Sequence, residues 1–277
     1  MSAVSEQIQE LSEKIKSGNL PQGLADSILV RLSQLSNLTD SLSFLPEFDS
    51  MNRYIDWILS LPWTQRTEDN LDLGTARQIL DKNHYGLEEI KNRVLEYLSV
   101  MKLKKERNEG DQIMRAPILC FVGLVGTGKT TIAVSIAEAL GRKFARIPFG
   151  GMGDPLDLRG QSRMHPEAEP GKVIKALRQA QSKNPVILLD EIDRVTDQGR
   201  SSIMGVLVEL LDPGQNYAFV DHYLDYPIDL SEVLFIATAN NTTNIATAVL
   251  DRLEPIVMPS YTDQEKTVIA KKYILPR

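Results

Sequence analysis

A glycine-rich string, GLVGTGKT, constrains this chain more than any other feature of its sequence. It has the pattern G-x-x-x-x-G-K-[ST], and it lies between an apolar run and a helical pattern. Glycines let backbone N–H groups turn towards a phosphate, and the start of a helix adds partial positive charge. With a strand before it and a helix after it, such a string binds nucleotide phosphates. We therefore expect a phosphate-binding loop made of Gly123, Leu124, Val125, Gly126, Thr127, Gly128, Lys129 and Thr130.

Apolar runs alternate with helical patterns between residues 118 and 258. The runs are ILCFV (118–122), FARI (144–147), VILLD (186–190), VLFIAT (233–238) and PIVM (255–258). Strands that are apolar along their whole length are covered on both faces, as in a parallel sheet between two layers of helices. The sequence therefore predicts an α/β fold with a five-stranded parallel sheet.

Polar residues end two of these runs, at the edge where open α/β sheets bind ligands. Asp190 and Glu191 end the third run, and Asn240 follows the fourth. We expect Thr130 and Asp190 to hold the Mg²⁺ of a bound ATP, and Glu191 to polarise the water that attacks the γ-phosphate. Asn240 is expected to hydrogen-bond the γ-phosphate and that water; an Asn-Asn turn is the alternative.

Arg252 lies between a short helical pattern and the last run, directly after Asp251. Two roles fit it. An arginine there could stabilise transition-state charge on ATP held by an adjacent subunit. The alternative is a surface ion pair between Asp251 and Arg252.

Three helical patterns lie at the start of the chain. Val4, Ile8, Leu11 and Ile15 recur at spacings of four and three, and similar spacings mark residues 24–35 and 54–61. These helices either pack on the body of the protein or form an arm that meets a neighbouring subunit.

Composition excludes several classes of protein. With 31 Lys and Arg against 37 Asp and Glu, the net charge is −6, which argues against nucleic-acid binding. No apolar stretch approaches the length of a membrane span. Cys120 is the single cysteine, so the chain forms no internal disulfide, and the sequence predicts a cytoplasmic location, or an organelle matrix in a eukaryote.

Together these motifs resemble the AAA+ ATPases and, from about residue 52, the Lon protease family. The stretches that carry the resemblance include Tyr54 to Trp57, Leu61 to Trp63, His84 to Leu87, Pro170 to Lys172, Asp190 to Asp193, Leu211 to Pro213 and Asp221 to Leu224. The resemblance implies a P-loop ATPase core in a homo-hexameric ring that hydrolyses ATP to unfold and thread unfolded or damaged proteins. It also implies that Arg252 acts in trans, that Asn240 is the polar sensor, and that His84, Tyr85 and Gly86 form part of the adenine pocket. Residues 1–66 would be a helical stem, and residues 67–277 the large α/β ATPase domain.

The chain departs from that family in three places. It ends at Arg277, where Lon continues into a helical lid and a Ser-Lys protease domain, so we expect no peptidase activity from these residues. In the segment where the family has an aromatic-aliphatic pair that grips substrate in the pore, the aromatic is replaced by His165 and its neighbour is Pro166, directly after Met164. Ser201 to Ile203 stand where the family has Gly-Asp-Pro. Substrate grip is therefore expected to be altered, unless Met164 serves as the gripping side chain.

Three functions remain open at this point. The first is an ATP-hydrolysing motor module of a Lon-type protease. The second is a nucleotide-dependent assembly or scaffold module with little remodelling activity, which the altered pore loops favour. The third, a DNA remodeller related to clamp loaders or helicases, is disfavoured by the net negative charge.

Overall fold

A computed structural model describes residues 3–36, 44–107 and 117–275. Five parallel strands form its central sheet, in the order β2-β3-β6-β1-β7. Their bounds are β1 Ile118–Val122, β2 Phe144–Pro148, β3 Val186–Asp190, β6 Leu234–Ala239 and β7 Leu253–Val257. The predicted α/β fold with a five-stranded parallel sheet is therefore confirmed, and each predicted run matches one strand to within two residues.

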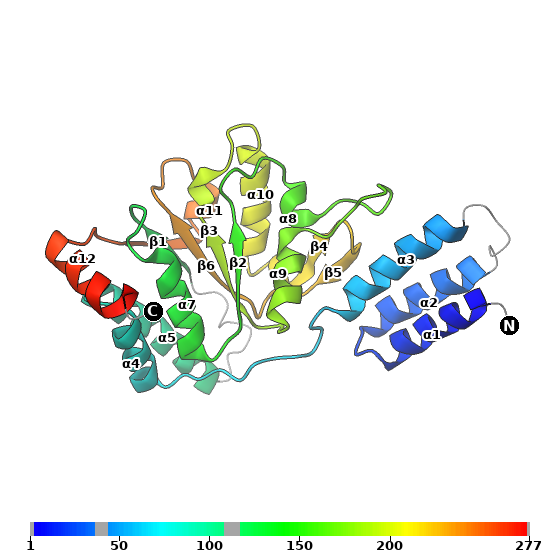
Figure 1. Ribbon diagram of the computed structural model, residues 1–277, viewed down its shortest axis with the longest axis horizontal. Helices are drawn as coiled ribbons and strands as arrows, with labels where there is room; N and C mark the ends of the chain where they lie inside the picture. The colour runs from blue at the N-terminus through cyan, green and yellow to red at the C-terminus, as the bar shows by residue number, and fades with distance from the viewer. Residues whose placement is uncertain (1–2, 37–43, 108–116, 276–277) are drawn as a thin grey trace.

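Helices cover both faces of this sheet, and alternate residues of each strand face opposite layers (Figure 1). One layer contains α4 (Leu73–Asn83), α5 (Glu88–Glu106) and α7 (Lys129–Leu140). The other contains α8 (Leu156–Arg159), α9 (Lys172–Ala180), α10 (Arg200–Leu211) and α11 (Thr247–Leu250). Leu188 of β3, for example, packs in the first layer and Leu189 in the second, so the apolar runs are buried on both sides.

The short elements of the fold were not expected from the sequence. They are η1 (Ile192–Arg194), η2 (Asn216–Ala218), the antiparallel hairpin of β4 (Phe219–Asp221) and β5 (Tyr226–Ile228), α12 (Asp263–Ile269) and the π-helical turn η3 (Ala270–Ile274). Strands of three residues are too short to show the alternation that identifies a strand. No helix among the described residues has the length and apolar character needed to cross a bilayer.

The N-terminal helices form an arm at one end of the molecule (Figure 1). It consists of α1 (Ala3–Ser17), α2 (Gln22–Ser36) and α3 (Phe44–Leu59), and the last of these contacts the body directly. The Tyr54 hydroxyl of α3 donates to the carbonyl oxygen of Leu224 at 3.1 Å. The Arg178 guanidinium of α9 lies 4.1 Å from the ring centre of Trp57. The arm thus joins the main core through α3.

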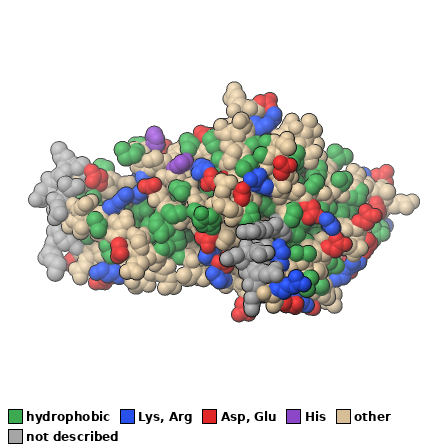
Figure 2. All heavy atoms as spheres, turned by 180° about the vertical axis from the view of Figure 1, so that it is seen from behind, with side chains coloured by type: hydrophobic (Ala, Val, Ile, Leu, Met, Phe, Trp, Pro, Cys, Tyr) green, Lys and Arg blue, Asp and Glu red, His purple; other side chains and the backbone are tan. Residues whose placement is uncertain are grey.

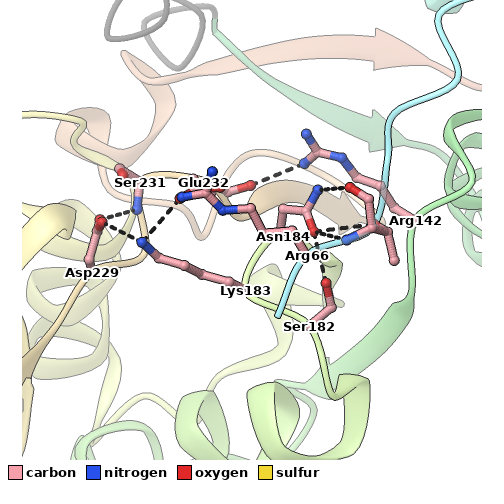
Figure 3. Close-up of polar contacts among 9 residues, drawn as sticks. Arg66, Arg142, Ser182, Lys183, Asn184, Asp229, Ser231 and Glu232 are labelled. Atoms are coloured by element: carbon pink, nitrogen blue, oxygen red, sulfur yellow. Dashed lines mark hydrogen bonds and ion pairs between the residues drawn. The ribbon is translucent and has the colours of Figure 1, made fainter. Parts of the chain in front are cut away.

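A cluster of polar side chains holds the connection between arm and sheet at the N-terminal ends of the strands (Figure 3). The Asn184 side chain accepts from the backbone N–H of Thr67 at 2.9 Å and donates to its carbonyl oxygen at 2.8 Å. Arg142 donates to both carboxylate oxygens of Asp69, at 2.6 and 2.7 Å, and to the carbonyl oxygen of Glu232 at 3.0 Å. These contacts fix the connection at the edge of the sheet opposite to the phosphate-binding loop.

Candidate active site

The expected phosphate-handling residues come together at the C-terminal edge of three adjacent strands. The phosphate-binding loop follows β1, and Asn240 follows β6. Asp190 is the last residue of β3, and Glu191 comes directly after it. Lys129 Nζ donates to Asn240 Oδ1 at 3.2 Å and so joins the loop to the end of β6. The sheet order therefore places side chains far apart in sequence around one site.

The backbone of the phosphate-binding loop requires its glycines. Gly126 and Gly128 have φ angles of +85° and +93°, in the left-handed region that other residues rarely adopt. A Cβ on Gly123 would lie 2.6 Å from the carbonyl oxygen of Met258. The loop then opens directly into α7, whose first residue is Lys129, so backbone N–H groups and a helix N-terminus face the same space.

Lys129 lies buried at the centre of the loop. Its Nζ donates to the carbonyl oxygens of Gly123 and Leu124, at 2.6 and 2.9 Å. Burial lowers the pKa of this ammonium group, while the charges of Glu191 and Asp190 oppose the shift. The ammonium group is therefore preorganised next to the loop, and Thr130 follows it in the first turn of α7.

Asp190 and Glu191 are held by a threonine that the sequence did not suggest. The Thr238 hydroxyl, fully buried on β6, donates to Asp190 Oδ1 and accepts from the backbone N–H of Glu191 at 2.9 Å. Glu191 has a φ of +58°, a left-handed conformation that ends β3 abruptly. A Cβ on Gly150 would lie 3.3 Å from Glu191 Oε2, so a glycine there leaves room for the carboxylate.

Asp193 positions the asparagine that the sequence identified. Its buried carboxylate accepts from the backbone N–H groups of Asn240 and Asn241, at 3.1 and 3.4 Å. The side-chain nitrogen Asn240 Nδ2 is buried without a hydrogen-bond partner among the described residues. A buried donor without an acceptor is costly, and a phosphate oxygen would satisfy it. This unpaired donor, beside Lys129 and the glycine loop, fits a bound nucleotide.

Arg252 lies at the opposite edge of the sheet from this chain's own phosphate-binding loop. Its carbonyl oxygen accepts from the N–H of Ile118, at the start of β1, whereas the loop follows the end of β1. A strand of five residues spans about 16 Å. The Arg252 side chain donates to Asp212 Oδ2 at 2.7 Å, so its ion-pair partner is not the neighbouring Asp251. A role of this guanidinium on ATP would therefore require an adjacent subunit.

The turn of residues 84–86 lies near α7 and α12. His84 is buried, with Nε2 2.9 Å from Ser135 Oγ of α7, and burial lowers the pKa of its imidazole to about 4. A Cβ on Gly86 would lie 4.0 Å from the Glu265 carboxylate. The His84 ring is thus turned towards α7.

The expected substrate loop, residues 161–170, is held at its base by a buried carboxylate and is exposed at its tip. The Asp221 carboxylate, fully buried, accepts from the N–H of Gly171 at 2.8 Å. At the tip, Met164 is 89% exposed, and His165 and Pro166 are also exposed. No hydrogen bond or ion pair among the described residues joins these three residues to the phosphate-handling group.

A groove of about 1390 Å³ separates this loop from the arm. Two contacts bridge the groove. The Arg163 guanidinium lies 3.8 Å from the ring centre of Tyr54, and Arg53 donates to the carbonyl oxygen of Pro166 at 3.4 Å.

On the face of the molecule shown in Figure 2, acidic and basic side chains of the described residues are interspersed without a continuous basic surface.

Sequence reasoning missed three residues that support the site: Arg146, Asp193 and Thr238. A weak signal exists for two of them, since Arg146 and Thr238 are the polar or charged members of otherwise apolar runs. Such a residue on a strand that is covered on both faces needs a polar partner. The identity of that partner depends on strand order, which the sequence does not give.

The sequence of this chain is similar to those of known ATPases and proteases. The model of the "ATPase family associated with various cellular activities (AAA)" matches residues 119–261. Lon protease 2 of Thermus thermophilus is 48% identical, over 98% of this chain and 34% of its own length. Lon protease 1 of Sorangium cellulosum is 47% identical over 96% of this chain and 33% of its own length. Lon protease of Dictyoglomus thermophilum is 46% identical over 98% of this chain and 33% of its own length. The chain thus spans about a third of the length of these relatives.

Proposed function

Because this chain belongs to the AAA family of ATPases, as a Lon-type AAA module, we propose that it hydrolyses ATP to drive unfolding and translocation of protein substrates. The observation that supports this function best is the group formed by Lys129, Asp190, Glu191 and Asn240 at one edge of the sheet. A loop that only bound a nucleotide would not need Glu191 and Asn240 at that edge.

Each of these residues has a separate role in the proposed reaction. Lys129 and the loop N–H groups bind the phosphates, and Asn240 Nδ2 donates to the γ-phosphate. Glu191 accepts a proton from the attacking water. Thr130 and Asp190 would hold Mg²⁺, which neutralises charge that develops on the phosphates.

The proposed function includes a ring of identical subunits. We propose a homo-hexamer in which Arg252 of one subunit stabilises transition-state charge at the site of the next. Residues 1–66 would be a stem and residues 67–277 the ATPase domain, with substrate gripped at Met164, His165 and Pro166. We propose no peptidase activity for the residues of this chain, and unfolded or damaged proteins as its substrates.

A second function is favoured by the contacts of the expected substrate loop. Arg163 stacks on Tyr54, and Arg53 donates to the carbonyl oxygen of Pro166, so the loop is tied to the arm at two points. A tied loop without an aromatic gripping residue would suit a module that assembles with nucleotide but remodels little.

ATP turnover measured with and without Glu191 separates the two functions. We expect release of phosphate by the unmodified chain to exceed that of Glu191→Gln by about 100-fold or more, with unchanged binding of a fluorescent ATP analogue. Glu89→Gln, an exposed glutamate on α5, is the matched control and should turn over ATP normally. Turnover equal to that of Glu191→Gln would rule out the motor, and ATP-dependent assembly by light scattering would then support the scaffold function.

A further inference from the structure

Asp190, the proposed magnesium ligand, already has a cationic partner within the chain. Arg146 Nε of β2 donates to Asp190 Oδ2 at 2.7 Å, and a second guanidinium nitrogen contacts the same oxygen. The Asp190 side chain is 5% exposed, whereas that of Arg146 is 52% exposed. One member of this ion pair is therefore fixed in the site, and the other extends to solvent.

The register of the sheet explains why this arginine reaches that aspartate. Arg146 is paired with Leu188 and Pro148 with Asp190 on the neighbouring parallel strands β2 and β3. Arg146 and Asp190 thus share one face of the sheet, two residues apart in the register, which is within the reach of an arginine side chain. The Thr238 hydroxyl occupies Oδ1, so Arg146 is bound to the other carboxylate oxygen.

The two partners of Asp190 differ in how easily they can leave. Thr238 is fully buried on the adjacent strand β6, and its hydroxyl also accepts from the backbone of Glu191, so its position is fixed. Arg146 has a long side chain that is half in solvent, where an ion pair contributes little to stability. The guanidinium can therefore swing away from Asp190 at small cost.

We propose that Arg146 sets how strongly nucleotide binding at this site depends on Mg²⁺. This inference rests on the proposed function, in which Asp190 helps to hold that ion. Arg146 and Mg²⁺ bring positive charge to the same carboxylate. With Arg146 present, the negative charge of Asp190 is already neutralised, so a nucleotide gains less from Mg²⁺. Without Arg146, the Asp190 carboxylate repels the phosphates until the ion binds.

A purely structural ion pair between β2 and β3 makes a different prediction. Losing a structural contact would lower nucleotide affinity to the same extent with and without Mg²⁺. Losing a competing cation lowers affinity in EDTA while affinity in Mg²⁺ is maintained or increased. The diagnostic quantity is therefore the ratio of the two dissociation constants, not either constant alone.

The experiment titrates the chain with a fluorescent ATP analogue in EDTA and in saturating Mg²⁺. We expect Arg146→Gln to raise the ratio of the dissociation constant in EDTA to that in Mg²⁺ by about tenfold. Arg146→Lys retains the positive charge and should stay near the unmodified ratio. Arg66→Gln removes an arginine of similar exposure that pairs with Glu232 at the opposite edge of the sheet, and should leave the ratio unchanged.

The outcomes separate this inference from the proposed function. An unchanged or lowered ratio in Arg146→Gln, with normal Mg²⁺-dependent binding by the unmodified chain, overturns the inference alone. Equal losses of affinity in both conditions assign a structural role and also overturn it. If the unmodified chain binds no ATP analogue in either condition, the proposed function fails and the inference fails with it. Far-ultraviolet circular dichroism of each variant verifies folding, and Arg146→Met, which also removes the charge, replaces Arg146→Gln if that variant does not fold.

Discussion

The phosphate-handling edge of the sheet and the loop of residues 161–170 differ in how their functional side chains are held. At the sheet edge, Asp190 is fixed by a buried threonine, and the backbone of Asn240 is fixed by the buried Asp193. In the loop, the base is fixed by Asp221, but the tip is exposed and is steadied by Arg163 stacked on Tyr54.

This difference follows from the chemistry that we propose for each region. Phosphate transfer needs donors and carboxylates at fixed positions, and buried strands provide them. A loop that contacts many polypeptides needs exposed side chains and tolerates variation at its tip. Substitutions should therefore have large effects at the sheet edge and at the loop base, and small effects at the loop tip.

The base of the loop is the place where the largest loss of stability is expected. A Cβ on Gly171 would lie 2.0 Å from the carbonyl oxygen of Leu158 and 2.6 Å from the backbone nitrogen of Gly160. Because both neighbours are backbone atoms, Gly171→Ala should destabilise the fold by about 4 kcal/mol or more, measured by urea unfolding. Gly205→Ala is the matched control, since a Cβ at that position of α10 meets nothing within 4 Å and should add about 0.5 kcal/mol of stability. Equal stability of the Gly171 variant and the unmodified protein would refute a tight loop base.

Burial of His84 should make the stability of the α7 layer depend on pH. The imidazole pKa is 6.5 in the unfolded chain and about 4 in the folded one, so the unfolded state takes up the proton first as the pH falls. The stabilisation is complete above pH 6.5 and should be lost progressively towards pH 4, by up to about 3 kcal/mol.

Chemical unfolding at a series of pH values tests this dependence. His84→Asn should flatten the curve between pH 6.5 and 4. His222→Asn, which changes an exposed histidine, should retain the full decrease. A decrease of the same size in both variants would show that other groups cause it.

Loss of Lys129 should remove most nucleotide affinity without harming the fold. The ammonium group is held beside the loop by three acceptors, and charge-assisted bonds to phosphate contribute about 2 kcal/mol. Lys129→Met should therefore weaken binding of a fluorescent ATP analogue by about 30-fold. Lys143→Met, at an exposed position before β2, should bind normally. Normal affinity in Lys129→Met would place the phosphates elsewhere.

A smaller effect is expected where the loop meets the arm. Arg163→Ala removes the guanidinium that lies 3.8 Å from the Tyr54 ring, and should cost about 1 kcal/mol of stability. Arg163→Lys should lose only part of this, because it retains the charge. Affinity for the ATP analogue should remain unchanged in both, and a marked loss of affinity would show that the two regions are coupled.

The smallest effect on stability is expected at the loop tip. His165→Tyr should change the free energy of unfolding by less than about 0.5 kcal/mol, since His165 is exposed. It restores an aromatic residue to the proposed gripping position. In a full-length protease that contains this chain, we expect a change in ATP-dependent unfolding of a tagged protein. No change would refute the hypothesis that grip depends on this residue.

Much of the fold was predictable because its signals are local. The five apolar runs became the five strands, since runs apolar on both faces have few other uses in a protein of this composition. The hairpin of β4 and β5 gave no such signal, because its strands of three residues are stabilised by contacts with distant segments. The carbonyl oxygen of Leu224 in its turn, for example, is bonded by Tyr54 of the arm.

The sequence by itself determined which groups could handle phosphate, because a glycine loop ending in Lys129 and a strand ending in Asp190 and Glu191 permit few other chemistries. Only the tertiary structure decided how these groups are supported and oriented. Strand order brought Thr238 and Arg146 to the two oxygens of Asp190, and the parallel pairing of β7 with β1 placed Arg252 at the N-terminal ends of the strands. The physical reason is that motifs act over a few residues of backbone, whereas hydrogen bonds and ion pairs between strands depend on their order and register in the sheet.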